Sequence, residues 1–142
     1  ALVFDPGSNS FRVGYAQEDT PKADIPSAVG IAPDSSVPNP EDKPPNSNSI
    51  TPSAATWKYY IDTISLHNPQ PNMEVSGFME KGMISNWDLF EKMLDFSYKR
   101  IIQSQSEYHP VLFSESPWNL KSEREKLVEI MFEKYHVPAF FL

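Results

Sequence analysis

The sequence contains no cysteine, so neither a disulfide framework nor a thiolate zinc site can form. No apolar run reaches the roughly 18 residues that a membrane-spanning helix needs, and no basic stretch leads into an apolar one near Ala1. We therefore expect neither a membrane span nor a secretory signal. The 12 Lys and Arg are outnumbered by 19 Asp and Glu, giving a net charge of -7. Because neutralising phosphates needs clustered positive charge, direct contact with nucleic acid is not expected.

The residues that are present describe a folded α/β protein. At 142 residues, with 39% hydrophobic and 13% aromatic residues, the chain can bury the core of one domain. Both extremities, residues 1–4 and 138–142, are apolar and are typical of buried strands. We expect them to belong to a sheet whose remaining pieces lie outside this sequence.

Three segments follow from the composition along the chain. Residues 1–31 predict a sheet segment in which two strands join through a short turn as an antiparallel hairpin. Residues 32–56 hold six prolines and no aromatic residue, so they predict a disordered surface insertion. Residues 57–142 resume an ordered pattern, beginning with an aromatic strand at 57–61.

The last segment predicts two helices around one strand. Asn86 is expected to cap a helix over residues 87–103, and residues 110–113 form the strand. The second helix is expected to open with a capping box from Ser122 to Glu125 and to end before Pro138. Both helices carry an apolar stripe at helical spacing, made of Phe90, Met93, Leu94, Ile101, Ile102 and of Leu127, Ile130, Met131, Tyr135.

The turn between the first two expected strands is the best candidate for a binding site, and it reads DPGSNS. Gly7 allows a phosphate to approach the main chain, and Ser8 and Ser10 carry hydroxyl donors. Arg12 can supply charge-assisted hydrogen bonds, and Asp5 suits a hydrated Mg²⁺ ion. A turn of this composition is also typical of a plain hairpin connection, so the residues alone leave both interpretations open.

Other polar residues favour structural roles. His67, His109 and His136 lie far apart without metal-ligand spacing. Acidic residues of the second helix alternate with basic ones, which is typical of a solvated, salt-bridged face.

Four blocks, read in order, resemble the actin family over nearly the whole chain outside residues 32–56. They are ALVFDPGSNSFRVGYAQEDTPKADIPSAVG, GMISNWDLFEKML, HPVLFSESPWN and SEREKLVEIMFEKYHVPAF. Within the family, the opening block, the run YYIDT and the third block are similar to the nuclear, Brahma-associated, class-four group of actin-related proteins. The resemblance implies a partial actin-like ATPase fold, with a mixed five-stranded sheet and flanking helices.

By position, the resemblance implies a first phosphate loop of Gly7, Ser8, Asn9 and Ser10, with Arg12 on the phosphates. Asp5 would hold Mg²⁺ or Ca²⁺ through water, and the nucleotide of the full-length protein would be ATP. Two departures stand out. Asn9 replaces the second loop glycine, and the sequence stops before the family's water-orienting Gln and second phosphate loop. Residues 1–142 are therefore expected not to hydrolyse ATP and not to bind Mg·ATP in the micromolar range.

The resemblance also implies a nuclear scaffold subunit, with ATP as a structural ligand. The expected partners are actin, the helicase-SANT-associated helix of a remodelling ATPase, and other subunits of SWI/SNF-type remodelling and histone-acetyltransferase complexes. The alternative is an actin-like ATPase or cytoskeletal actin-related protein whose missing C-terminal half completes catalysis. A sugar-kinase-like or chaperone-like protein would share only the phosphate turn.

Overall fold

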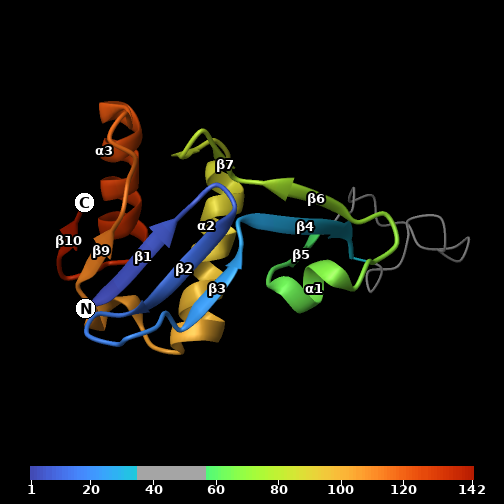
Figure 1. The fold of residues 1–142 in the computed structure, drawn as a ribbon, viewed down its shortest axis with the longest axis horizontal. Helices are drawn as coiled ribbons and strands as arrows, with labels where there is room; N and C mark the ends of the chain where they lie inside the picture. The colour runs from blue at the N-terminus through green and yellow to red at the C-terminus, as the bar shows by residue number, and fades with distance from the viewer. Residues whose placement is uncertain (35–56) are drawn as a thin grey trace, which may run out of the picture.

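The computed structural model describes residues 1–34 and 57–142 (Figure 1). In these residues a mixed five-stranded sheet runs in the order β10-β9-β1-β2-β3, beside a three-stranded sheet β5-β4-β6 and a β7–β8 hairpin. The strands are β1 Leu2–Pro6, β2 Ser10–Tyr15, β3 Ala23–Pro26, β4 Ala28–Pro33, β5 Trp57–Tyr60, β6 Glu74–Gly77, β7 Met79–Glu80, β8 Met83–Ile84, β9 Val111–Phe113 and β10 Phe140–Phe141. The helices are α1 Thr63–His67, α2 Trp87–Phe96 and α3 Lys121–Glu129. The expected α/β class, with helices flanking a mixed sheet, is confirmed.

The five-stranded sheet is built on the expected hairpin. β1 and β2 pair antiparallel, with Leu2 opposite Tyr15. β9 lies parallel to β1 on the other side and is followed by the parallel β10. Because Phe4 is the register partner of Phe113, their rings stack at a centroid distance of 4.8 Å.

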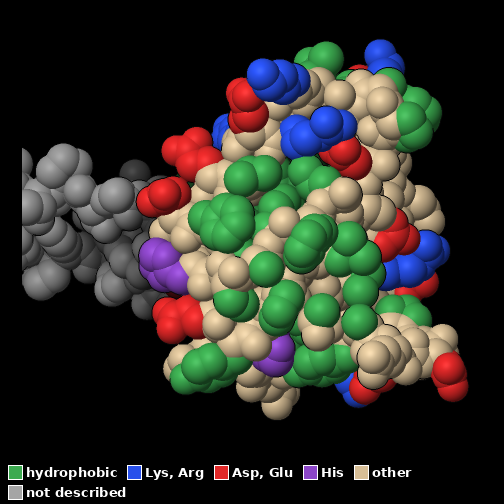
Figure 2. Space-filling view, turned by 90° about the vertical axis from the view of Figure 1, so that its left-hand side faces the viewer, with side chains coloured by type: hydrophobic (Ala, Val, Ile, Leu, Met, Phe, Trp, Pro, Cys, Tyr) green, Lys and Arg blue, Asp and Glu red, His purple; other side chains and the backbone are tan. Residues whose placement is uncertain are grey.

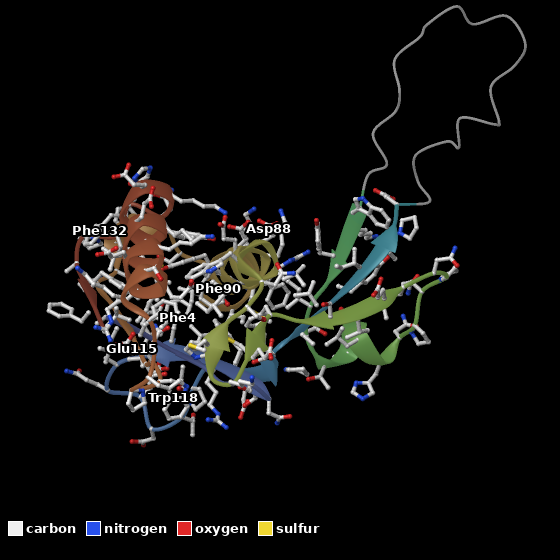
Figure 3. The ribbon with its side chains drawn as sticks, turned by 90° about the horizontal axis from the view of Figure 1, so that it is seen from above. Phe4, Asp88, Phe90, Glu115, Trp118 and Phe132 are labelled. Atoms are coloured by element: carbon white, nitrogen blue, oxygen red, sulfur yellow. The ribbon has the colours of Figure 1, made fainter. Side chains whose placement is uncertain are left out.

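Helices α2 and α3 cover the same face of this sheet, where Phe4 and Phe90 lie (Figure 3). The Phe90 ring lies edge-on to Phe11 and tilted against Phe113, so α2 is fixed over the sheet centre by aromatic packing. Most of the expected stripe residues are buried here, whereas Ile101 and Ile130 are only partly buried.

The opposite face of the sheet is open in the described residues. Val3, Leu112 and Phe141 are neighbours in the strand register, and Leu112 and Phe141 are 43% and 62% exposed. Figure 2, which looks at the β10 edge next to this face, shows hydrophobic side chains gathered there as well. Parallel strands normally have both faces covered, so this surface is unusual for its strand arrangement.

The start of α2 agrees with the prediction from the sequence, whereas the start of α3 does not. Asn86 caps α2 as expected, because its side chain accepts a hydrogen bond from the Leu89 N–H at 3.1 Å. After α2 the chain continues as a π-helical turn over Ser97–Ile102. The capping box at Ser122 is wrong: α3 begins after Leu120, whose side chain cannot cap, so Ser122 lies inside the first turn.

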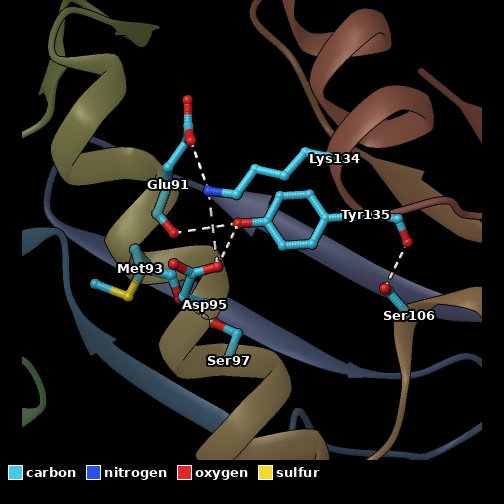
Figure 4. Close-up of polar contacts among 7 residues, drawn as sticks. All are labelled: Glu91, Met93, Asp95, Ser97, Ser106, Lys134 and Tyr135. Atoms are coloured by element: carbon cyan, nitrogen blue, oxygen red, sulfur yellow. Dashed lines mark hydrogen bonds and ion pairs between the residues drawn. The ribbon is translucent and has the colours of Figure 1, made fainter.

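A polar cluster joins the two helical segments (Figure 4). The Tyr135 hydroxyl donates to Asp95 at 2.9 Å, and Lys134 pairs with Glu91 at 2.6 Å. Burial, followed by the charge of Asp95, raises the pKa of Tyr135. The hydroxyl therefore stays protonated. Tyr135, at the end of the helical segment that begins with α3, thus always donates a hydrogen bond to α2.

The small sheet changes one expected boundary. The segment predicted as disordered begins at Ala32, yet Ala32 is 1% exposed and pairs with Lys58 in the β4–β5 ladder, and Pro33 pairs with Trp57. Residues 35–56, which hold most of that predicted segment, lie outside the described residues. Across residues 1–34 and 57–142, no helix has the length and apolar character to cross a bilayer.

Candidate functional site

The candidate loop lies where the β1–β2 hairpin turns, beside the end of β9. Pro6, next to Asp5, ends β1 and Ser10 opens β2, so the hairpin itself brings the two ends of the predicted loop together. Arg12 stands opposite Asp5 in the strand register. The structure thus brings the predicted site residues together at one end of the β1–β2 hairpin: Asp5, Gly7, Ser8, Asn9, Ser10 and Arg12.

Gly7 is the position where the loop has no room for a side chain. A Cβ atom there would lie 2.9 Å from the Ser10 carbonyl oxygen, which also accepts the Gly7 N–H at 3.0 Å. The Gly7 carbonyl in turn accepts the hydroxyl of Ser27 at 2.6 Å, and Ser27 is buried. Hydrogen bonds on the inner side therefore hold the loop in place. Because Gly7 has no Cβ atom, its main chain stays uncovered on the outer side.

Asn9 occupies the place where the resemblance implies a second glycine. Its side chain is exposed, and its carbonyl accepts the Ser27 N–H at 3.1 Å. Its φ angle is not in the left-handed region, so this turn does not need glycine at position 9 for backbone reasons.

Ser8 connects the loop to the β7–β8 turn. Its hydroxyl oxygen accepts the Gly82 N–H at 3.1 Å, which leaves the hydroxyl hydrogen available to donate. The Gly82 carbonyl accepts from Ser116, and the Lys81 carbonyl accepts from the indole N–H of Trp118, labelled in Figure 3. Three chain segments therefore meet at the loop.

A row of charges crosses the sheet beside the loop. Arg12 donates from Nη1 to Asp5 at 3.3 Å and from Nε to Asp24 of β3 at 3.1 Å. The other Asp5 oxygen accepts a hydrogen bond from the Ser114 hydroxyl. The hydrogen bond to Asp24 is the main cause that raises the pKa of Arg12, and the same bond lowers the pKa of Asp24. All three charges are about half exposed.

A groove of about 320 Å³ runs from this row along the open face of the sheet. Asp5 and Arg12 stand at one end, and the turn around Glu18 closes the other. The remaining walls come from β1 and β2, so the groove adjoins the loop and shares two of its charged residues.

Glu115, the residue after Ser114, is a third carboxylate in this part of the molecule that is paired with other side chains (Figure 3). It accepts hydrogen bonds from Asn119 at 2.9 Å and Arg124 at 3.1 Å. Desolvation raises its pKa, but the hydrogen bonds from Arg124 and Asn119 outweigh it and leave the pKa below its ordinary value. These bonds fix the approach to α3.

The three histidines and Lys121 form their contacts with residues outside the loop. Within residues 1–34 and 57–142, no three His, Cys, Asp or Glu side chains lie close enough to hold a metal ion together. His67 and His136 each bond to a carbonyl four residues earlier, and His109 to Ser104. Lys121 pairs with Glu125 on the exposed face of α3.

Sequence reasoning missed four neighbours of the loop: Asp24, Ser27, Gly82 and Ser114. Each lies on a different segment from the turn, and strand register and crossovers bring them to it. For Asp24 a signal was present, since an acidic residue in the strand after Arg12 can pair across the hairpin.

The fold and loop define a class before any comparison: a mixed sheet whose first hairpin turn can receive an anion. The pattern of the actin family matches residues 1–142 in full, so the chain belongs to the actin family. Among its relatives, actin-related protein 4 of Arabidopsis thaliana is 35% identical over 100% of this chain, and that of Yarrowia lipolytica 33% over 99%. The SWI/SNF and RSC complexes subunit arp42 of Schizosaccharomyces pombe is 32% identical over 100%.

The chain spans about a third of the length of these relatives: 34%, 31% and 29% in the same order. The actin family generally binds a nucleotide with a divalent metal. The loop fits this ligand in part. Gly7 offers the bare backbone that a phosphate approaches, and Asp5 is exposed enough to contact a hydrated ion. Arg12 differs, because two carboxylates already engage its guanidinium.

Proposed function

We propose that this chain is part of an actin-related scaffold subunit of a nuclear chromatin-remodelling complex. The observation that carries the proposal is its similarity, over 100% of its length, to a protein named as a subunit of the SWI/SNF and RSC complexes. The matches to actin-related protein 4 from a plant and a yeast point to the same group. Histone-acetyltransferase complexes are a second setting for such a subunit.

In this proposal a nucleotide serves as a structural ligand of the longer protein. Gly7, Ser8, Asn9 and Ser10 form the phosphate loop, with Arg12 facing the phosphates and Asp5 meeting Mg²⁺ or Ca²⁺ through water. Bound ATP would supply negative charge that organises the loop. The hydroxyl hydrogen of Ser8 is available to donate to it, since Gly82 bonds only to the oxygen.

The proposed partners are actin and the helicase-SANT-associated helix of a remodelling ATPase, together with other subunits. Direct contact with nucleic acid is not proposed, because the net charge of -7 opposes it.

The second candidate is an actin-like ATPase, or a cytoskeletal actin-related protein, completed by further chain. The observation that favours it is the exposed Asp5 beside the phosphate turn, since a metal-binding carboxylate also serves hydrolysis. We propose that residues 1–142 are themselves no enzyme. Phosphate release by the full-length protein on Mg·ATP, abolished by Asp5→Asn, would support the ATPase instead.

The scaffold proposal is tested by affinity purification of the full-length protein from nuclear extract, with partners identified by mass spectrometry. We expect a remodelling ATPase and actin to co-purify in stoichiometric amounts. The matched control is a tagged conventional actin in the same extract, which sets the background of cytoskeletal partners. Recovery of cytoskeletal proteins alone would move the second candidate to first place.

A further inference from the structure

Asp24 has a position that the proposed nucleotide site does not use. It lies on β3, directly opposite Arg12 of β2 in the strand register. Its carboxylate accepts the Arg12 Nε–H at 3.1 Å, and this bond is the main cause that lowers the pKa of Asp24. Arg12 is the cationic side chain that the proposed nucleotide site places on the phosphates. One carboxylate therefore engages a donor that a phosphate would need.

In this geometry the Asp24 carboxylate acts toward Arg12 as a bound anion would. A carboxylate and a phosphate present the same kind of acceptor oxygen to a guanidinium and a hydroxyl. Arg12 has five N–H donors and keeps some of them, but its charge is already shared between Asp24 and Asp5.

We propose that Asp24 is a built-in competitor of the nucleotide phosphates, which withholds Arg12 from them and so lowers the affinity of the loop. This inference rests on the proposed nucleotide site. Asp5, Arg12 and Asp24 carry a net charge of -1, which also opposes the approach of a polyanion. With Asp24 removed, the same row becomes neutral and the Arg12 Nε–H is released, while Arg12 keeps its pairing with Asp5.

The test measures Mg·ATP affinity of the full-length protein by calorimetry, for the unmodified chain and for Asp24→Asn. We expect the variant to bind about threefold to fivefold more tightly, the size of effect that half-exposed charge pairs give. The gain should shrink as salt rises, because screening weakens the competing ion pair. Asp24→Glu should return the affinity to the original value.

Two controls separate competition from a general change of charge. Glu18→Gln removes one carboxylate from the wall of the same groove, where Glu18 pairs with Lys22 and not with Arg12. Its affinity should stay within about twofold of the unmodified protein. In an Arg12→Ala background, the effect of Asp24→Asn should fall, since the main donor under competition is then gone.

The outcomes distinguish this inference from the proposed function. If the unmodified protein and Asp24→Asn both fail to bind Mg·ATP, the nucleotide site and the competition are overturned together. If the protein binds and Asp24→Asn binds equally or more weakly, only the competition is overturned. An equal gain from Glu18→Gln would also overturn it, because bulk charge would then explain the effect. Thermal unfolding of each variant checks that the folded population is unchanged.

Discussion

Gly82 combines a left-handed backbone conformation with a close packing distance, and together they strain any side chain placed there. Its φ is +76°, and a Cβ there would lie 2.3 Å from the hydroxyl of Ser116. We predict that Gly82→Ala lowers the free energy of unfolding by about 1–3 kcal/mol through strain and loss of the Ser116 hydrogen bond. Urea unfolding of the full-length protein measures this.

The matched control is Gly77→Ala, where the nearest atom to the new Cβ is the Ser27 carbonyl oxygen at an ordinary 3.6 Å. That variant should unfold close to the original midpoint. The double change Gly82→Ala with Ser116→Ala should recover part of the loss, since the clashing hydroxyl is gone. Equal midpoints for the two glycine variants would contradict the prediction.

Glu115 gives the molecule a pH dependence of defined sign. Its pKa in the folded protein is lowered, so its stabilisation is complete above the unfolded pKa of about 4.3 and is lost as pH falls through the folded value. We predict that Glu115→Gln destabilises by about 1 kcal/mol at pH 7, and that the difference disappears in strong acid. Thermal unfolding at several pH values tests this, with the exposed Glu125→Gln as the control that should change little.

Single side chains were the part of the candidate site that the sequence described least completely. Gly7, Ser8 and Ser10 could be selected because a turn between two strands requires small and polar residues in that order. Asp24 and Ser114 could not, because their closeness to Asp5 and Arg12 depends on which strands become neighbours. No local pattern around Ser114 indicates that β9 will lie parallel to β1.

The two long helices differ at their first residue, which makes a paired experiment possible. Asn86 caps α2, whereas Leu120 stands at the α3 cap with extended backbone angles and no side-chain acceptor. We predict that Leu120→Asp stabilises the protein by about 0.5–2 kcal/mol and that Asn86→Ala destabilises it by about 1 kcal/mol. Chemical unfolding measures both.

Leu120→Ala separates the two effects at position 120, since it removes the exposed leucine without adding a cap. That variant should show little change. If Leu120→Ala stabilises as much as Leu120→Asp, the gain comes from removing an exposed apolar side chain and the capping explanation is wrong.

For the helices and strands, their presence was easier to predict than the residues at which they begin and end. The apolar stripe of α2 and its Asn86 cap could be predicted, because apolar residues recur clearly at helical spacing and the cap lies directly before the helix. The start of α3 could not be predicted, because Ser122 and Glu125 fit a capping box by spacing alone, while Leu120 occupies the N-cap position. Ala32 was assigned to the proline-rich stretch by composition, yet pairing with β5 makes it part of a strand.

The whole molecule combines a well-packed face of the large sheet with an open one. The loop contributes one side of a nucleotide site, and the donors on Arg12 are shared with two carboxylates. We predict that residues 1–142 by themselves show no saturable Mg·ATP binding in the micromolar range, as measured by calorimetry. Micromolar binding by this piece, with loss in Gly7→Val, would refute it. The longer protein, assayed in parallel, is the positive control.

The parallel pairing of β1 with β9 sets the order in which the chain can fold during synthesis. Leu2 pairs with Val111, so β1 leaves the ribosome roughly a hundred residues before its parallel neighbour exists. At translation rates of about 5–20 residues per second, that interval lasts on the order of 5–20 s. During this interval the β1–β2 hairpin has one edge unpaired, and its core-facing Phe4 lacks the Phe113 ring that later stacks on it. Such a nascent chain is a natural client for a folding chaperone.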